Sequence, residues 1–237
     1  MAAILTHYLI GEKFIEKYKN FNEDDLISFL VGTIAVDAPN SQGKGFEERE
    51  KSHFGSSPRM ALLNHGNFDL EGNVLDYDSF LEKYGNQLDN PFVEGYLLHL
   101  YTDKKWFREI ITELLNTHAS TINGTAKTAH DLSFKEAIAW YTKNLYATYE
   151  IHDILFYPFL NLQHIEEMSN YNVENCPIEE INKQDLKSML EQLKIKCENL
   201  KNSDPIENPN ILIPLDTMLS FIDTCAMEAH QLYSNSK

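Results

Sequence analysis

The sequence lacks several features that mark well-known classes of protein. It has three cysteines, Cys176, Cys197 and Cys225, which are far apart and form no CxxC pair. We therefore expect no disulfide framework, and we expect the protein to work in a reducing compartment. No apolar run reaches the ~18 residues needed to cross a membrane. The opening residues, MAAILTHYLIGEKF, place no basic stretch before an apolar one, so we expect a cytoplasmic protein without a signal peptide.

Positive charge is also scarce. Lysine and arginine total 20 against 36 aspartates and glutamates, which gives a formal net charge of −16. A nucleic-acid scaffold or an anionic membrane surface requires a basic face, so neither is expected as a partner. A small anionic substrate stays compatible with this charge, because a bound metal cation dominates the field near it.

Alternating strand patterns, internal repeats and low-complexity tracts are missing, and helical spacing dominates instead. Apolar residues recur at three- and four-residue steps, as from Ile4 to Tyr18. We therefore expect an all-α, multi-helix single domain over residues 1–237. Caps and prolines predict helices at about 4–18, 23–38, 76–88, 91–115, 133–156, 158–168, 177–199 and 211–233.

Residues 38–75 differ from the rest of the chain because glycine and serine cluster there. We expect a long loop with at most short helical turns. A loop of this length in a compact domain is usually functional or disordered.

The segment GYLLHLYTDKKW, residues 95–106, carries the most informative pair. His99 and Asp103 are four residues apart, so on a helix they share a face with Cβ atoms about 5–6 Å apart. An imidazole nitrogen and a carboxylate oxygen at that spacing can reach one cation, and a buried carboxylate is costly unless it is paired or on a metal. The alternative is a plain His–Asp hydrogen bond in a core helix, because HxxxD alone is a weak motif.

Three further residues favour a metal site. Asp37 ends the apolar segment FLVGTIAVD, where an acid faces the negative end of a helix dipole and a cation would stabilise it. His53 lies in the glycine- and serine-rich loop, and His7 lies on or beside the buried face of the first helix. Each also has a plainer interpretation. Asp37 would be a turn aspartate before Pro39, His53 an exposed loop histidine, and His7 a hydrogen-bonded core histidine.

In this order, His7, Asp37, His53 and the pair His99-x-x-x-Asp103 resemble the zinc-dependent phospholipase C family. The segments THYLIG, FLVGTIAVDAPN, SHF and GYLLHLYTDKKWF are similar to that family's N-terminal helix, aspartate turn, histidine loop and central helix. The resemblance covers roughly residues 1–110 and implies the helical fold that this family shares with single-strand nucleases.

The resemblance also implies a ligand set. Asp37, His53, His99 and Asp103 match the ligands of one zinc, and His7 and Asp103 match ligands of a neighbouring zinc. Asp37 would in addition act as general base. The family's remaining zinc needs a later HxxxE segment, and the sequence has none. We therefore expect one or two zinc ions, and Mn or Fe also suits such a mixed set.

The activity implied is hydrolysis of a phosphoester by hydroxide generated on the metal. We expect a soluble phosphodiester or phosphomonoester rather than a phospholipid, because the chain shows no basic amphipathic helix. The loop cations are Lys44, Arg49, Lys51 and Arg59, and of these Arg59 is the expected phosphate clamp.

Other interpretations stay open. They are a metal-binding protein of the same fold without catalysis, a helical scaffold without metal, and an HD-type metal phosphohydrolase suggested by His130-Asp131 and His152-Asp153. On the favoured interpretation residues 1–118, with the loop 38–75, form a metal-binding core. Residues 119–237 then add packing helices, whose apolar stripes suit intrachain packing and a homodimer equally well.

Overall fold

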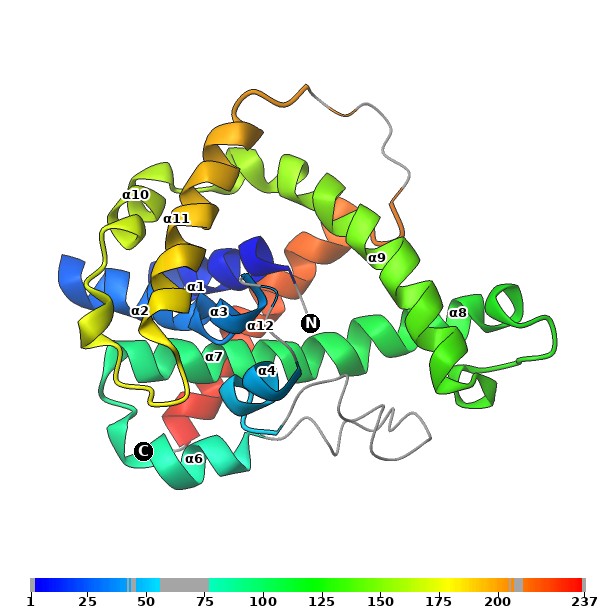
Figure 1. Ribbon diagram of the computed structural model, residues 1–237, viewed down its shortest axis with the longest axis horizontal. Helices are drawn as coiled ribbons and strands as arrows, with labels where there is room; N and C mark the ends of the chain where they lie inside the picture. Colours follow the sequence, from blue (N-terminus) through cyan, green and yellow to red (C-terminus); the bar gives the residue numbers. More distant parts are fainter. Residues whose placement is uncertain are drawn as a thin grey trace.

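The structure is a computed structural model, and it describes residues 3–41, 43, 46–55, 77–204, 206 and 211–235. Within these ranges the chain forms helices and no strand (Figure 1), which confirms the all-α prediction. In the same part of the chain, no helix combines the length and the apolar character that crossing a membrane requires.

Eleven α-helices are described, and they differ widely in length. They are α1 Ile4–Tyr18, α2 Glu23–Ala35, α3 Ala38–Ser41, α4 Phe46–Ser52, α6 Asp78–Tyr84, α7 Pro91–Lys105, α8 Thr112–Ile122, α9 Phe134–Phe156, α10 Leu162–Ser169, α11 Lys183–Leu200 and α12 Leu215–Asn235. Short 3-10 turns lie at Gly85–Gln87, Ala129–Asp131, Tyr157–Phe159 and Val173–Asn175. A π-helical segment, η2 Trp106–Ile111, joins α7 to α8.

Side-chain caps fix several helix starts where the sequence predicts them. The Asn22 side chain accepts a hydrogen bond from the backbone N–H of Asp25 and begins α2. Ser133 and Glu136 form a reciprocal capping box at the start of α9. Such caps satisfy backbone N–H groups that have no partner within the helix, so local sequence sets these boundaries.

Helices α2 and α7 form the centre of the fold, and their backbones touch. A Cβ atom added to Gly32 would lie 2.2 Å from the Phe92 carbonyl oxygen, and one added to Gly95 would lie 2.2 Å from that of Phe29. Only glycine allows so close an approach. Helix α1 packs against α2 and α12, and α11 packs against α3 and α10 (Figure 1), so the central pair is covered by elements from both ends of the chain.

Three of the predicted helix limits are wrong. Helix α2 ends at Ala35, before Pro39, and the proline lies in α3 instead. The helix predicted to end near residue 115 continues through the π segment to Ile122. Residues 177–182 are not helical, because the Asn182 side chain accepts from two backbone N–H groups and begins α11 there.

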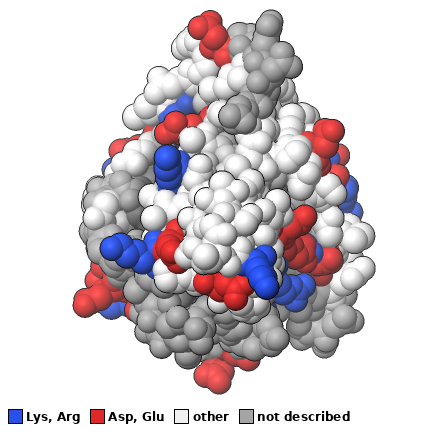
Figure 2. Space-filling view, turned by 90° about the vertical axis from the view of Figure 1, so that its right-hand side faces the viewer, with Lys and Arg blue, Asp and Glu red and all other residues white. Residues whose placement is uncertain are grey.

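The segment 38–75 contains the short helices α3 and α4, in agreement with the prediction for its first part. Residues 56–76, which include Arg59, lie outside the described residues, and so does Lys44. On the face in Figure 2, acidic and basic side chains are interspersed around a broad uncharged area.

Candidate metal centre

The five predicted ligands come together from four separate segments. His7 lies in α1, Asp37 in the turn between α2 and α3, and His53 directly after α4, while His99 and Asp103 lie one turn apart in α7. Asp37 is 8% exposed and the other four are 1% exposed or less. The structure therefore buries three imidazoles and two carboxylates in one place.

Asp103 lies in the middle of this cluster. Its Oδ1 is 3.4 Å from Nε2 of His7, and its Oδ2 is 3.5 Å from Nε2 of His99. The same Oδ2 is 3.5 Å from Nε2 of His53, which in turn lies 3.8 Å from Oδ1 of Asp37. The rings of His7 and His99 stack with their centroids 3.7 Å apart.

Backbone carbonyls orient two of the histidines. Nδ1 of His99 lies 2.8 Å from the Thr33 carbonyl oxygen, and Nδ1 of His53 lies 2.8 Å from that of Arg49. A carbonyl oxygen only accepts, so each Nδ1 must carry the hydrogen, and in the neutral ring Nε2 then presents a lone pair. Carbonyl or carboxylate partners commonly orient metal-ligating histidines in this way.

This orientation creates an unfavourable contact that a cation would relieve. Nε2 of His99 is buried without a hydrogen bond, and a carboxylate oxygen of Asp103 faces it at 3.5 Å. A lone pair and a carboxylate repel each other unless a proton or a metal ion lies between them. Neither ring nitrogen of His7 makes a hydrogen bond either, although burial of such a group is costly. The residues therefore fit a metal ion.

Burial and mutual charge shift the pKa values within the cluster in opposite directions. Burial, with a smaller contribution from the neighbouring His99, lowers the pKa of His7 to about 4 against the opposing effect of Asp103 and Asp37. Burial also acts to lower the pKa of His99, but Asp103, Asp37 and the Thr33 carbonyl outweigh it and the pKa is raised. For Asp103, burial acts to raise the pKa, but the adjacent imidazoles of His53, His7 and His99 hold it well below its usual range.

Two sets of three residues have the compactness that one cation requires. They are His7, His99 and Asp103, and Asp37, His53 and His99. In each set the potential ligand atoms lie within 4.8 Å of one another. The shared residue is His99, whereas the resemblance suggested Asp103 as the bridge. Mixed imidazole and carboxylate donors suit zinc, and also Mn or Fe.

The HD dipeptides lie elsewhere and make other contacts. Nε2 of His152 lies 2.8 Å from the Ile213 carbonyl oxygen, and Asp153 forms an ion pair with Lys196. Asp131 accepts from the backbone N–H of Thr128 at 2.9 Å and so caps a 3-10 turn. Neither dipeptide belongs to a metal-sized cluster among the described residues.

Sequence reasoning missed an aromatic group beside Asp103. The Tyr149 ring lies 6.1 Å from that of Trp106, three residues after Asp103, and the hydroxyls of Tyr141 and Tyr149 are 3.5 Å apart. These tyrosines are eight residues apart, about two helical turns, on the same side of α9 as the buried Leu145. That spacing is the sequence signal that indicates a shared face.

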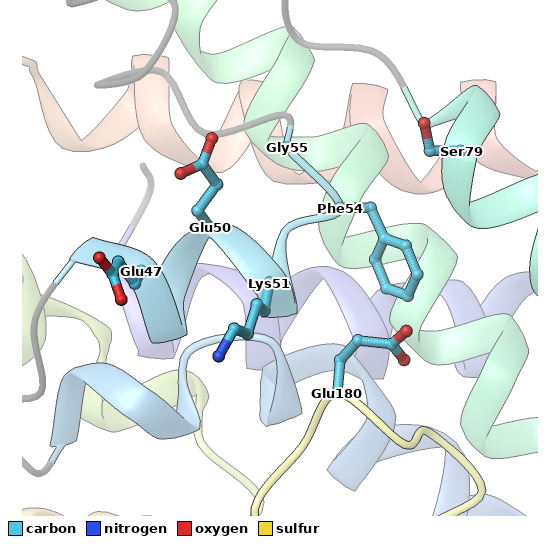
Figure 3. Close-up of a pocket in the computed structure, with 7 residues that line it drawn as sticks. All are labelled: Glu47, Glu50, Lys51, Phe54, Gly55, Ser79 and Glu180. Atoms are coloured by element: carbon cyan, nitrogen blue, oxygen red, sulfur yellow. The ribbon is translucent and has the colours of Figure 1, made fainter.

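A cavity of about 530 Å³ borders the segment that carries His53 (Figure 3). It lies between α4, the start of α6 and residue 180, and its lining residues are Glu47, Glu50, Lys51, Phe54, Gly55, Ser79 and Glu180. Phe54 has a φ of 54°, a left-handed conformation that is uncommon for residues other than glycine. None of the five candidate ligands lines this cavity, which therefore lies outside the candidate metal centre.

No protein-family model, no curated protein sequence and no solved structure matches the chain. What this protein does must therefore be inferred from the chemistry of the five converging side chains.

Proposed function

We propose that the chain is a metal-dependent hydrolase of phosphoesters. In this proposal His7, Asp37, His53, His99 and Asp103 hold one or two zinc ions, with Mn or Fe as alternatives. The observation that carries the proposal is the convergence of these side chains in two overlapping sets, each with its ligand atoms within 4.8 Å. The burial of both carboxylates beside imidazoles supports a cation, since charges are rarely buried without compensation.

The metal would lower the pKa of a bound water toward neutrality and offset negative charge on a phosphoryl group. The protein side chains would hold the metal and orient its ligands. Thr33 and Arg49 orient two imidazoles through their carbonyl oxygens. Asp37 is the most exposed of the five, at 8%, and it follows a helix end in a turn. That position supports a role in holding the attacking water and taking its proton.

A small, soluble phosphodiester or phosphomonoester is the proposed substrate. The order and spacing of the ligands resemble the zinc-dependent phospholipase C family, which supports phosphoester chemistry. The net charge of −16 would repel an anionic substrate, so local metal charge is needed to hold it.

A metal-binding protein without catalysis is the second candidate. The observation in its favour is burial, because no candidate ligand is more than 8% exposed. A substrate must reach the metal, whereas a structural metal is usually closed off from solvent.

Metal content and turnover distinguish the two candidates. Purified protein is stripped with a chelator, titrated with zinc, and analysed for bound metal and for hydrolysis of bis(p-nitrophenyl) phosphate and p-nitrophenyl phosphate. The hydrolase proposal predicts one or two zinc ions per chain and turnover that the chelator removes. Stoichiometric zinc without turnover of either ester supports the second candidate, and absence of bound metal contradicts both. The His152→Gln variant is the matched control, because it alters a buried histidine outside the centre.

A further inference from the structure

His53 is supplied to the candidate metal centre by a short helix. It directly follows α4, which has seven residues, whereas His7, His99 and Asp103 lie on helices of fifteen residues. A helix as short as α4 is only marginally stable without contacts to other elements. The position of the His53 backbone therefore depends on what holds the end of α4.

The backbone at this end closes the helix with a left-handed residue directly after His53. The N–H of Phe54 donates to the Lys51 carbonyl oxygen at 3.1 Å, and that of Gly55 donates to the Glu50 carbonyl oxygen at 3.0 Å. Helices that end with this pair of bonds usually have glycine at the first left-handed position. Here that position is Phe54, with a φ of 54°. A side chain is unfavourable for such a backbone, so the contacts of the Phe54 ring must offset this cost.

The Phe54 ring packs edge-on against three aromatic rings outside α4. Its centroid lies 5.2 Å from that of Phe80, 5.8 Å from that of Tyr84 and 6.1 Å from that of Tyr96, with interplanar angles of 84°, 89° and 87°. Phe80 stacks on Tyr96 in turn, with centroids 5.2 Å apart. Edge-on and stacked pairs at these separations are favourable. This aromatic cluster anchors the residue next to His53 to α6 and α7.

The Tyr96 hydroxyl holds the same helix end by a hydrogen bond. It donates to the backbone carbonyl oxygen of Ser52, the last residue of α4, a group that has no partner within its own helix. Burial raises the pKa of Tyr96 well above its usual range, so the phenol keeps its proton for this bond. Tyr96 lies on α7, one turn before His99. The bond therefore joins the segment that carries His53 to the helix that carries two other candidate ligands.

We propose that Phe54 and Tyr96 are positioning residues that hold the His53 imidazole within reach of the metal. This inference rests on the metal centre of the proposed function. Neither residue belongs to the two candidate ligand sets, and both act through the backbone on either side of His53. Loss of either contact should therefore weaken zinc binding only as long as His53 is present.

Zinc binding by the full chain tests this role without requiring turnover. Competition with a chromogenic chelator gives the zinc affinity of the wild type, Tyr96→Phe and Phe54→Gly. Tyr96→Phe removes only the hydroxyl group, and Phe54→Gly removes the ring while suiting the left-handed backbone. Each change is expected to weaken zinc binding about tenfold, the lower end of the effect of losing a partner that orients a ligand.

Tyr84→Phe is the matched control, because Tyr84 belongs to the same aromatic cluster. Its hydroxyl donates to Glu180 at 2.8 Å and accepts from the backbone N–H of Glu179 at 2.9 Å, so it does not hold α4. This variant should bind zinc like the wild type. Equal losses in Tyr84→Phe and Tyr96→Phe would assign the effect to general packing and overturn the positioning role.

A second background separates positioning from general destabilisation. In His53→Ala, the set His7, His99 and Asp103 still offers a place for zinc, and adding Tyr96→Phe should leave the zinc affinity unchanged, because no imidazole is left to position. A further loss of about tenfold in that background overturns the proposal.

The remaining outcomes separate this inference from the proposed function. Wild-type zinc affinity in either single variant overturns the role of that residue, and phosphoester turnover by the same variant leaves the hydrolase standing. Failure of the wild type to take up zinc overturns both proposals. If circular dichroism shows that Tyr96→Phe does not fold, Phe54→Gly decides by the same criteria, alone and in the His53→Ala background.

Discussion

Two buried histidines, one in each half of the chain, show what distinguishes a candidate metal centre from ordinary packing. His99 and His152 are both 1% exposed. Each has one ring nitrogen 2.8 Å from a carbonyl oxygen, that of Thr33 for His99 and that of Ile213 for His152. Both rings are therefore buried and held by a carbonyl oxygen, and neither property alone indicates a ligand.

The second ring nitrogen makes the difference. In His99 it faces Asp103 at 3.5 Å, and the ring stacks on His7. In His152 the second nitrogen makes no hydrogen bond and the ring stacks on Phe156. A metal site requires several donors aimed at one point, and only the N-terminal half provides this among the described residues.

The largest expected effect comes from removing the central carboxylate. Asp103→Asn keeps the shape but removes the charge that three histidines face. We expect zinc affinity to fall by more than about a hundredfold, because loss of a ligand exceeds the 10–100-fold typical of an outer partner. Turnover should fall at least as much. Equilibrium dialysis with metal analysis measures the zinc affinity. The control is Asp153→Asn, which alters a buried carboxylate paired with Lys196.

The comparison of the two histidines can be tested directly. His99→Gln and His152→Gln should each lower the free energy of unfolding by about 1–3 kcal/mol in chelator, since each disrupts a buried hydrogen bond. Only His99→Gln should also lose zinc, by about tenfold or more in affinity. Urea unfolding and zinc titration measure the two effects. Equal loss of zinc in both variants would contradict the assignment of the centre.

Metal-free protein should lose stability in acid because of His7. Its pKa is lowered to about 4 in the folded state, mainly by burial, with His99 adding to the shift while Asp103 and Asp37 oppose it. The unfolded chain takes up this proton near pH 6.5 and the folded chain does not, so stability falls as pH drops from 6.5 toward 4. We expect this group to account for about 2 kcal/mol between pH 7 and pH 4.5.

The contribution of His7 is isolated by comparing the wild type with His7→Phe. Urea midpoints of both proteins are measured in chelator at the two pH values. The other two titrating groups act outside this pH window. The pKa of Asp103 lies well below its usual range, so its contribution to stability is lost only at lower pH. The pKa of His99 is raised, so its contribution to stability is lost as the pH rises. An acid loss in His7→Phe equal to that of the wild type would show that His7 is not held neutral.

The contact between α2 and α7 gives a last test, at a position that holds no candidate ligand. Gly95→Ala would place a methyl group against the Phe29 carbonyl and push the helices apart, which costs about 1–3 kcal/mol of stability. Because His99 follows one turn later and bonds to Thr33 of α2, zinc affinity should fall by about tenfold. Gly124→Ala is the control, since an added Cβ there meets nothing within 4 Å, and it should change stability by less than about 0.5 kcal/mol.

Much of the fold, and the grouping of the candidate ligands, could be predicted from the sequence. Caps such as Asn22 and Ser133 act locally, and the spacing of His99 and Asp103 on one helical face is a local property as well. The convergence of His7, Asp37 and His53 on that face was predicted from their order, through the family resemblance, and the structure brings all of them there.

The remaining features depend on packing between distant segments. The carbonyl oxygens of Thr33 and Arg49 orient two of the candidate ligands, but every residue has a carbonyl, so no sequence signal marks them. Tyr149 reaches Trp106 only because α9, which is distant in the sequence, passes the π segment that follows α7. The start of α11 was predicted at Pro177, a permitted first position, but the Asn182 side chain supplies the stronger cap.

The π-helical segment Trp106–Ile111 has a consequence for the spacing of buried residues on either side of it. One wide turn accommodates an extra residue with almost no added rotation, so the helix beyond it keeps the orientation that ordinary α winding would give, with each residue one place later in the sequence. Leu115 and Ala119, which are buried on α8, therefore follow Asp103 at a spacing that an uninterrupted α-helix would place on a different face. Deletion of a single residue from Arg108–Ile110 should restore ordinary winding and leave both the candidate ligands of α7 and the buried side of α8 where they are. The extra residue is thus confined to one turn, and the helices before and after it keep their own packing.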